Sequence, residues 1–441
     1  MPPVRPLPYD ARIAIMGAGC AGLTCAEELR ERGYQRVTVF EARSRAGGKV
    51  HSVPYADAPS SGRGLFEAGT VFFVPSPMWT KLLRRHGVAE TQTFMPRVRI
   101  ADVQLGTSIN PLRFAHGYST TARAFQIARF LSVLNQHGRA HDRQPGLAAH
   151  VAPDLCVATR GWFDAMGLPF VRDVLLPIAG GAQFGPLIDT VPAIYVLHLL
   201  TMLRRYSLAQ RLRLAMPQLA AGHEAVWTRI AAAHDVRMGE PVTQIAVADG
   251  VLVTSATGCE RFEALIVAAP TGAYLSAATH LTDDERALLL QVRTLTREVI
   301  TARISGLGRG IFYAPRYGTD GVVPPAHPYL CYEVDPGSGV FTFHPYLDGG
   351  SGPADTEAAM RELVARLGGR VTAIEHRVVV RDWFPHFPEA PLRAGAYARL
   401  EAMQGRGNVW MAGELLAGIG VPHGMEYAAD LVSRMAGAAN D

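Results

Sequence analysis

Residues 12 to 49 constrain the fold of this chain more than any other stretch. Apolar segments at 13–16 and 37–40 are predicted to be strands, and a helix that ends near Gly33 is predicted between them. A glycine-rich turn joins the first strand to the helix, so the stretch has the pattern of a complete βαβ unit. The residues of this turn are Gly17, Gly19, Cys20, Ala21 and Gly22.

The spacing of the three glycines is typical of a dinucleotide-binding turn. Gly17 permits a tight turn, Gly19 lets a pyrophosphate approach the backbone, and Gly22 lets the helix pack closely on the strand. The helix N-terminus then offers unpaired N–H groups and a partial positive charge to an anion. Glu41 follows the second strand, where its carboxylate can accept hydrogen bonds from ribose hydroxyls. A purely structural turn is the alternative, but the strands, the helix and the terminal acid together favour a nucleotide.

The segment after Glu41 favours flavin over nicotinamide. A basic residue followed by paired glycines suits a chain that passes a pyrophosphate and the edge of a bulky ring. On these residues the sequence resembles the flavin amine oxidase superfamily, which includes monoamine oxidases, polyamine oxidases, protoporphyrinogen oxidases and the phytoene desaturase group. In that family Arg-x-Gly-Gly-Arg follows the acid, and here Lys49 stands where the last arginine is usual. The resemblance implies noncovalent FAD held at Ala42, Arg43, Arg45, Gly47, Gly48 and Lys49.

Four more segments extend the resemblance along the chain. The segment 66–70 is similar to one that packs beside the flavin, and 240–245 is similar to a strand whose valine contacts the adenine. A third match is 265–270. The fourth, 409–425, has a strand, a turn and a glycine-rich loop that leads to a helix from about Met425. The further cofactor-binding residues implied by these matches are Ala68, Gly69, Thr70, Val242, Ala269, Gly413, Glu414 and Met425.

The chain is long enough for two domains, since it has 441 residues and 48% hydrophobic content. The resemblance implies an α/β fold, with a discontinuous Rossmann-like FAD-binding domain and an inserted α+β substrate-binding domain. The FAD-binding domain is predicted at 1–84, 211–284 and 396–441, and the substrate-binding domain at 85–210 and 285–395. Helical patterns in the inserted parts lie at 124–134 and 191–203, and strand-like runs at 299–304 and 378–383.

We expect an FAD-dependent oxidoreductase that is amine-oxidase-like and acts on a small organic substrate. No second dinucleotide pattern is evident, so oxidation at a C–N or C–C bond is expected, with a hydride passing from a C–H bond to the flavin N5 and the electrons then to dioxygen or another acceptor. One alternative is a flavin-dependent desaturase or isomerase of an apolar or natural-product substrate. Another is a non-catalytic flavin-binding subunit.

Four residues are candidates for catalysis. Arg297 stands where many amine-oxidising members have a lysine that holds a water near N5, and arginine is larger, planar and almost always charged. Trp383 and Tyr397 are candidates for the flavin pocket. His423 lies in a turn that the resemblance puts beside the flavin, and histidine can act as a base near neutral pH. The alternatives are an ion pair at a strand end for Arg297, core packing for the aromatics and a structural hydrogen bond for His423.

Composition limits the partners. The formal net charge is only +4 and the basic residues are spread out, so nucleic acid is not expected. The five cysteines lack metal-ligand spacing, which predicts neither a metal site nor a disulfide framework. The apolar run at 191–203 is too short to span a bilayer and predicts a buried helix, with membrane docking or an apolar substrate tunnel as alternatives. No secretory signal is evident, which predicts a cytoplasmic protein. The sequence does not decide whether the chain assembles as a homodimer.

Overall fold

A five-stranded parallel sheet is the centre of one half of the molecule. The computed structural model describes residues 7–60, 62–71, 74–94, 97–109, 117–176, 181, 183–205, 216–316, 323–347 and 349–437. The sheet has the strand order β19-β13-β1-β2-β9, and every neighbouring pair is parallel. Its strands are β1 (Ile13–Met16), β2 (Val37–Glu41), β9 (Asp235–Met238), β13 (Ala264–Val267) and β19 (Val409–Met411).

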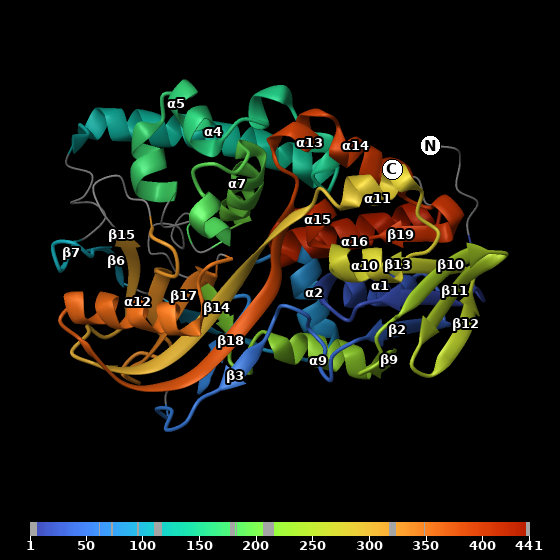
Figure 1. The fold of residues 1–441 in the computed structure, drawn as a ribbon, viewed down its shortest axis with the longest axis horizontal. Helices are drawn as coiled ribbons and strands as arrows, with labels where there is room; N and C mark the ends of the chain where they lie inside the picture. The colour runs from blue at the N-terminus through green and yellow to red at the C-terminus, as the bar shows by residue number, and fades with distance from the viewer. Residues whose placement is uncertain are drawn as a thin grey trace.

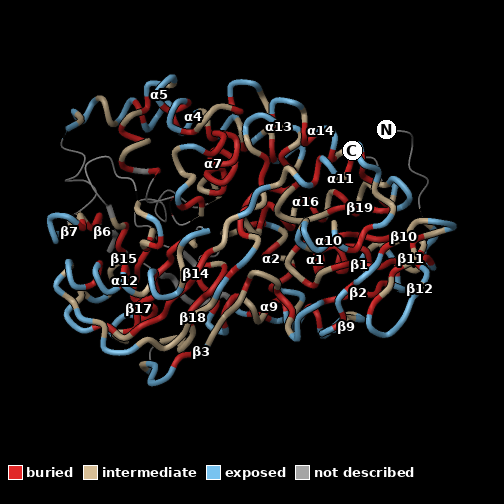
Figure 2. Tube along the Cα trace, in the orientation of Figure 1, coloured by how far each residue is buried: buried red, intermediate tan, exposed pale blue. Residues whose placement is uncertain are grey.

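Four of the five strands of this sheet are largely apolar and buried because helices cover them. Every residue of β1, β2, β13 and β19 is buried, as Figure 2 shows. Helix α1 (Cys20–Glu31) packs against α16 (Val421–Met435), and Figure 1 shows these two helices side by side although they come from opposite ends of the chain. The remaining helices of this half are α2 (Pro77–Arg85), α9 (Glu224–Ala232), α10 (Thr271–Ala277), α11 (Asp283–Leu289), α14 (Ala396–Met403) and α15 (Glu414–Ala417).

Three small antiparallel units lie outside this sheet. One is a three-stranded sheet of β10 (Gln244–Ala248), β11 (Gly250–Ser255) and β12 (Gly258–Phe262). The other two are strand pairs: β3 (Ser52–Pro54) with β4 (Leu65–Glu67), and β5 (Glu90–Phe94) with β8 (Met216–Leu219).

A seven-stranded, largely antiparallel sheet forms the other half, in the order β18-β14-β17-β16-β15-β6-β7. Figure 1 shows that β14 and β18 are long strands that run together from this sheet toward the parallel one. Helix α12 (Pro353–Arg366) covers the sheet, and its Met360 and Leu363 pack on Ile300 and Phe343. The strands are β6 (Arg97–Asp102), β7 (Thr107–Ile109), β14 (Arg293–Ser305), β15 (Ile311–Arg316), β16 (Pro328–Glu333), β17 (Val340–Leu347) and β18 (Arg370–His386).

A group of helices lies above both sheets in the view of Figure 1. Within the described residues, every helix is too short or too polar to cross a lipid bilayer. Every residue of α7 is buried, and a 3₁₀ turn at Thr201–Arg205 continues this helix. The apolar run at 191–203 is therefore a buried helix, which was one of the predictions for this run. The helices of the group are α4 (Thr120–Arg143), α5 (Thr159–Ala165), α7 (Ala193–Leu200) and α13 (Glu389–Arg393).

The predicted elements are found, but some are longer than predicted. The predicted strands at 13–16 and 37–40 match β1 and β2, whereas the helical run predicted at 124–134 is part of the longer α4 and the strand-like run at 378–383 is part of the longer β18. The last helix also starts earlier than predicted, because α16 begins at Val421 rather than near Met425. Pro422 lies in its first turn, where the missing N–H of proline costs no helical hydrogen bond.

The predicted domain division stays a prediction. All strands of the parallel sheet lie in the three segments predicted for the FAD-binding domain, and all strands of the seven-stranded sheet lie in the other two. The predicted boundary between 210 and 211, and the ends at 1–6 and 438–441, lie outside the described residues. The pairing of β5 with β8 crosses the predicted division.

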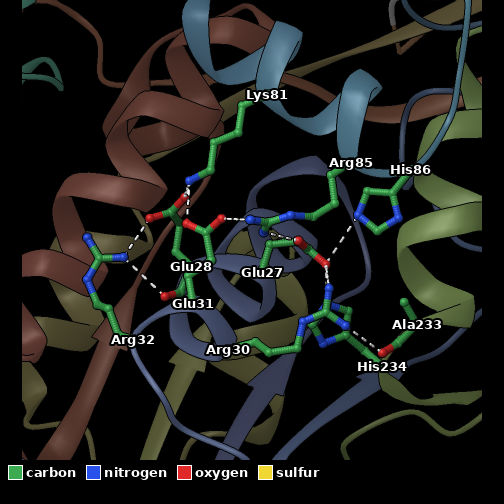
Figure 3. A network of polar contacts seen from close by, with 10 residues as sticks. All are labelled: Glu27, Glu28, Arg30, Glu31, Arg32, Lys81, Arg85, His86, Ala233 and His234. Carbon is green, nitrogen blue, oxygen red and sulfur yellow. Dashed lines mark hydrogen bonds and ion pairs between the residues drawn. The ribbon is translucent and has the colours of Figure 1, made fainter.

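A network of charged side chains joins α1 to α2 and to the loop before β9 (Figure 3). The buried carboxylate of Glu27 accepts hydrogen bonds from Arg30, Arg85 and His234, at 2.5, 2.8 and 2.7 Å. Lys81 of α2 contacts both Glu28 and Glu31. Burial alone would raise the pKa of Glu27, but hydrogen bonds from His234 and Arg85 and the charge of Arg30 lower it to about 2. The network fixes the helix that begins at the glycine turn.

Candidate functional site

A single cavity of about 980 Å³ runs along the carboxyl end of the parallel sheet and continues toward the helical group. Its wall is contributed by segments from almost the whole length of the chain, between Met16 and Gly424. A cleft at the carboxyl end of the strands is where open α/β sheets bind their ligands. The volume lies at the large end of the range for small-molecule sites.

The glycine turn forms the floor of the cavity, and its shape requires glycine. Gly17 has φ 108°, and a Cβ there would lie 2.8 Å from the carbonyl oxygen of Ala268. A Cβ on Gly22 would lie 2.0 Å from the carbonyl oxygen of Gly17, so this residue sets the packing of α1 on β1. Gly19, Cys20 and Ala21 line the cavity, whereas Gly22 lies behind them. Backbone at the N-terminus of α1 therefore faces the cavity without an intervening side chain at Gly17 and Gly19.

Glu41 lies at the end of β2 on the same wall. One carboxylate oxygen accepts from the backbone N–H of Ala18 at 2.8 Å, and the other accepts from that of Arg43 at 2.9 Å. These two bonds hold the buried carboxylate in place and leave lone pairs for ribose hydroxyls. Ala42 and Arg43 line the cavity beside it.

A second glycine loop packs directly on the first. Gly47 donates to the carbonyl of Ala18 at 2.9 Å, and a Cβ on Gly48 would lie 3.0 Å from the Cα of Gly19. Gly47, Gly48 and Lys49 line the cavity. The loop is therefore placed by its contact with the dinucleotide turn, as expected if both face one pyrophosphate.

Arg45 holds this loop from behind rather than lining the cavity. Its guanidinium donates to the carbonyls of Gly48 and Val50, at 2.8 and 3.0 Å, and pairs with Glu224 at 3.3 Å. Burial lowers the pKa of Arg45, although Glu224 opposes that effect. The predicted cofactor contact of Arg45 stays a prediction, and its observed contacts are those of a residue that positions the loop.

Lys49 and Glu414 form an ion pair on the cavity wall. Lys49 also donates to the backbone carbonyl of Asp382, next to Trp383. Because Glu414 begins α15 directly after β19, this pair connects the second glycine loop to the C-terminal part of the sheet. Two predicted cofactor-binding residues from distant segments thus meet at one point.

The segment at 68–70 crosses behind Lys49. Gly69 and Thr70 line the cavity, while Ala68 is fully buried behind the wall. A Cβ on Gly69 would lie 1.7 Å from the carbonyl oxygen of Lys49, so this crossing requires glycine.

Arg297 is buried behind the cavity wall. Its guanidinium donates to the carbonyls of Ala68 and Gly69, at 3.1 and 2.9 Å, and stacks on Trp383. Only 1% of Arg297 is exposed, and it is not among the residues that line the cavity. Trp383 does line the cavity, and its Nε1 donates to the carbonyl of Gln183 at 2.9 Å. The predicted catalytic role of Arg297 stays a prediction, and its contacts are those of a positioning residue.

The remaining predicted cofactor residues lie on or just behind the opposite wall. Val242, Ala269 and Gly413 line the cavity, and Gly413 has φ 111° with open space around its missing Cβ. Met425 is fully buried and does not line the cavity, whereas the preceding Gly424 does.

Two of the four catalytic candidates point away from the cavity. Tyr397 is buried, and its hydroxyl donates to that of Tyr195 at 3.3 Å. His423 is fully buried, with its ring against those of His141 and His198. Burial holds the pKa of His423 well below its ordinary value, and the charges of His141 and Arg205 act in the same direction, whereas the Ile419 carbonyl opposes them. Catalysis by either residue stays a prediction that these positions do not favour.

The far end of the cavity is apolar, and its residues were not predicted individually. They belong to α4, to the segment at 171–176 and to the apolar run at 191–203, for which an apolar tunnel was an alternative prediction. A buried helix and the wall of a tunnel are both built from apolar residues, so the sequence alone does not distinguish these two predictions. The apolar wall consists of Phe130, Val171, Leu176, Leu199, Leu200, Met202 and Leu203.

The two glycine loops fit FAD. Their backbone leaves space, free of side chains, in which a pyrophosphate can approach the N-terminus of α1. The carboxylate of Glu41 is held in place beside this space, where it can bind a ribose. The wall beyond them, with Gly413, Trp383 and the apolar residues, has room for a large planar ring and an organic molecule.

Comparison with known proteins agrees with this fit. The family model "Flavin containing amine oxidoreductase" matches residues 20–292. A tryptophan 2-monooxygenase of Agrobacterium tumefaciens is 37% identical over 84 residues, which are 19% of this chain and 11% of that protein. A polyenoic fatty acid isomerase of Ptilota filicina is 43% identical over 47 residues, which are 11% of this chain and 9% of that protein. The chain thus spans only about a tenth of the curated relatives that it matches.

Solved structures match over almost the whole chain. A fatty acid isomerase from P. acnes that produces CLA has a TM-score of 0.81 at 22% identity, covering 97% of this chain and 99% of that one. A putrescine oxidase has a TM-score of 0.67 at 15% identity, covering 97% and 98%. These likenesses show a shared fold.

The predicted fold class, the FAD cofactor and the class of FAD-dependent oxidoreductase are confirmed by the family match and the shared fold. The chain belongs to the flavin-containing amine oxidoreductase family.

Proposed function

We propose that this chain holds FAD noncovalently and oxidises a C–C or C–N bond of an apolar organic molecule, with the hydride leaving from a C–H bond at one of its carbons. One observation carries the proposal: the cavity that begins at the glycine loops continues without a break into the apolar wall. A substrate in that part would be held next to the cofactor and away from water, which favours hydride transfer over side reactions.

Bound FAD would supply the hydride acceptor and would pass the electrons on to dioxygen or another acceptor. The chain's own residues would bind and orient the cofactor and the substrate. Trp383 forms the wall between the loops and the apolar end, and Arg297 holds Trp383 from behind. Lys49 and Glu414 satisfy each other's charge, so neither leaves an unpaired charge facing an apolar molecule.

A second candidate is isomerisation, in which the hydride is removed and then returned to the same molecule. The apolar wall favours isomerisation, because a polyunsaturated chain requires a long apolar cavity. Such a chain does not require a site that binds a cation. The two fatty acid isomerases among the similar proteins support this candidate. Gly424 lines the wall. The family resemblance puts this glycine near the place where monoamine oxidases have a tyrosine, which supports a non-amine substrate.

The test uses purified protein reconstituted with FAD. Primary amines, tryptophan and polyunsaturated fatty acids are added one at a time without oxygen, and the flavin absorbance is followed. Lasting bleaching by one class, with hydrogen peroxide formed on admission of air, supports an oxidase with that substrate. Conversion of a fatty acid to a conjugated isomer without net bleaching supports the isomerase. A failure of all three classes to reduce the flavin or be converted contradicts the proposal and favours a non-catalytic subunit.

We also propose the cytoplasm as the compartment. All five cysteines are described and are free thiols, which agrees with a reducing environment. Light scattering on the purified protein tests whether it assembles as the homodimer that the sequence leaves open.

A further inference from the structure

Three histidine rings meet in the buried space between α4, α7 and the start of α16. His141, His198 and His423 come from these three helices, and each is at most 1% exposed. Their ring centres are 4.7 Å apart for His141 and His198, 4.5 Å for His141 and His423, and 4.2 Å for His198 and His423. One ring nitrogen from each lies within 4.8 Å of one from each of the others.

The Nε2 atoms of the three rings have hydrogen-bond partners that accept. Nε2 of His198 donates to the carbonyl of Ala417 at 2.9 Å, and Nε2 of His141 faces the carboxylate of Glu426 at 3.2 Å. Nε2 of His423 lies 3.3 Å from the hydroxyl of Thr201. That hydroxyl donates its own hydrogen to the carbonyl of His198, so it accepts from His423. These partners keep the Nε2 proton on each ring and leave Nδ1 as the lone pair.

The Nδ1 atoms are buried without such partners. Nδ1 of His141, of His198 and of His423 makes no hydrogen bond to any residue that the structure describes. A buried polar atom without a partner is costly, and three such atoms in one place call for a ligand. The backbone carbonyl of Ile419 favours the protonated form of the His423 ring. A ligand bound to this ring would therefore compete with that carbonyl.

We propose that His141, His198 and His423 bind a divalent transition-metal ion of the zinc class through their Nδ1 atoms. Three imidazoles are a common ligand set for zinc, and metal-bound histidines usually donate their other N–H to a carboxylate or a carbonyl. Glu426, the Ala417 carbonyl and the Thr201 hydroxyl supply that outer set here. Arg205 pairs with Glu426 at 2.6 Å, so the metal and the guanidinium share one negative charge.

The metal would act as a structural crosslink. It would join α4 and α7 of the helical group to α16, which packs on α1 beside the dinucleotide turn. Met202, Pro422 and Gly424, which are sequence neighbours of Thr201 and His423, line the cavity. The crosslink would therefore fix two neighbouring parts of the cavity wall and take no part in electron transfer.

The experiment uses untagged protein, so that the histidines of a tag do not contribute. The protein is treated with a chelator, exposed to equimolar zinc or cobalt, desalted and analysed for metal. We expect about one equivalent retained, and for cobalt a visible absorption band of the strength typical of a tetrahedral site. Failure of the wild-type protein to retain either metal overturns the proposal, and this result needs no variant.

The site is assigned by His141→Gln and His198→Gln, because the glutamine amide can still donate to the outer partner but lacks the inner lone pair. Both variants should lose the metal. The control is His344→Gln, which removes an equally buried histidine on β17, outside the cluster, and should keep the metal. Metal retained by a variant with both substitutions overturns the assignment. If the variants do not fold, chelation of the wild-type protein decides: a lower melting temperature that zinc restores supports the site, and an unchanged one overturns it.

Discussion

The guanidinium carbon of Arg297 lies 3.8 Å from the centre of the Trp383 ring, so a buried cation forms the back of a cavity wall. The same side chain donates to two carbonyls of the segment that crosses behind Lys49. One residue of β14 thereby ties β18 to the 68–69 segment, and that segment packs in turn on Lys49 of the second glycine loop.

Arg297→Lys should lose most of this connection, because an ammonium cannot stack on the indole and donate to both carbonyls in the same way. We expect the unfolding free energy to fall by about 1.5 to 3 kcal/mol, the range for a lost hydrogen bond to a charged group. FAD should also dissociate more readily. Thermal unfolding and flavin retention after gel filtration measure both effects. Arg293→Lys, on the exposed start of the same strand, is the control and should change neither. Equal behaviour of the two variants would contradict the positioning role.

Gly22→Ala tests the dinucleotide turn. The added Cβ would lie 2.0 Å from the carbonyl oxygen of Gly17, and this backbone atom cannot move without displacing the turn. We expect a loss of about 3 kcal/mol or more in stability and little bound FAD. Flavin absorbance per protein and thermal unfolding measure the outcome. Gly161→Ala is the control, since open space surrounds its missing Cβ on an exposed helix position. An FAD-replete Gly22→Ala protein would show that the turn tolerates a side chain.

The charge network at Glu27 predicts how stability depends on pH. The pKa of Glu27 is lowered from 4.5 to about 2 in the folded protein, so its contribution is complete above about pH 4.5 and is lost as the pH falls toward 2. Glu27→Gln should therefore cost about 2 to 3 kcal/mol at pH 7 and progressively less below pH 4.5. Urea unfolding at several pH values measures this difference. Glu362→Gln, at a half-exposed side chain of α12, should show no such dependence. A penalty for Glu27→Gln that does not shrink in acid would refute this account.

Leu200→Trp tests whether the apolar wall holds the substrate. The larger side chain would fill part of the cavity beyond the flavin loops. We expect KM for an apolar substrate to rise about tenfold or more, which corresponds to about 1.4 kcal/mol, while the FAD content stays unchanged. Steady-state kinetics with the substrate identified by flavin reduction measures it. Leu105→Trp, at an exposed loop position, is the control. Unchanged KM in Leu200→Trp would mean that the substrate binds elsewhere.

The parts of the site that the sequence predicts well are those governed by short-range sterics. Gly17 and Gly22 lie five positions apart. The φ of 108° at Gly17 concerns its own backbone, and a Cβ on Gly22 would collide with the carbonyl oxygen of Gly17, so the motif encodes both requirements directly. Glu41 is predictable for a similar reason, because the end of β2 is fixed once the βαβ unit is recognised. The local pattern is enough in these cases.

The roles that depend on side-chain direction across long separations could not be predicted. The contact between Arg297 and Ala68 joins residues 229 positions apart, and it depends on which face of β14 meets the 68–69 segment. The family resemblance put Arg297 near the flavin but could not show that its side chain lies behind Trp383. His423 is similar: it was predicted to lie in a turn beside the flavin, whereas it lies in the first turn of α16 with its ring against those of His141 and His198.

The strand order of the parallel sheet has a consequence for biosynthesis. A ribosome releases β1 and β2 early, but their sheet neighbours β13 and β19 begin only at residues 264 and 409. A nascent chain can therefore form the glycine turn long before the wall that contains Gly413 and Glu414 exists. This wall can form only after residues 409–414 have been synthesised, and until then the growing polypeptide depends on its own early helices, or on chaperones, to keep the exposed face of the sheet from aggregating.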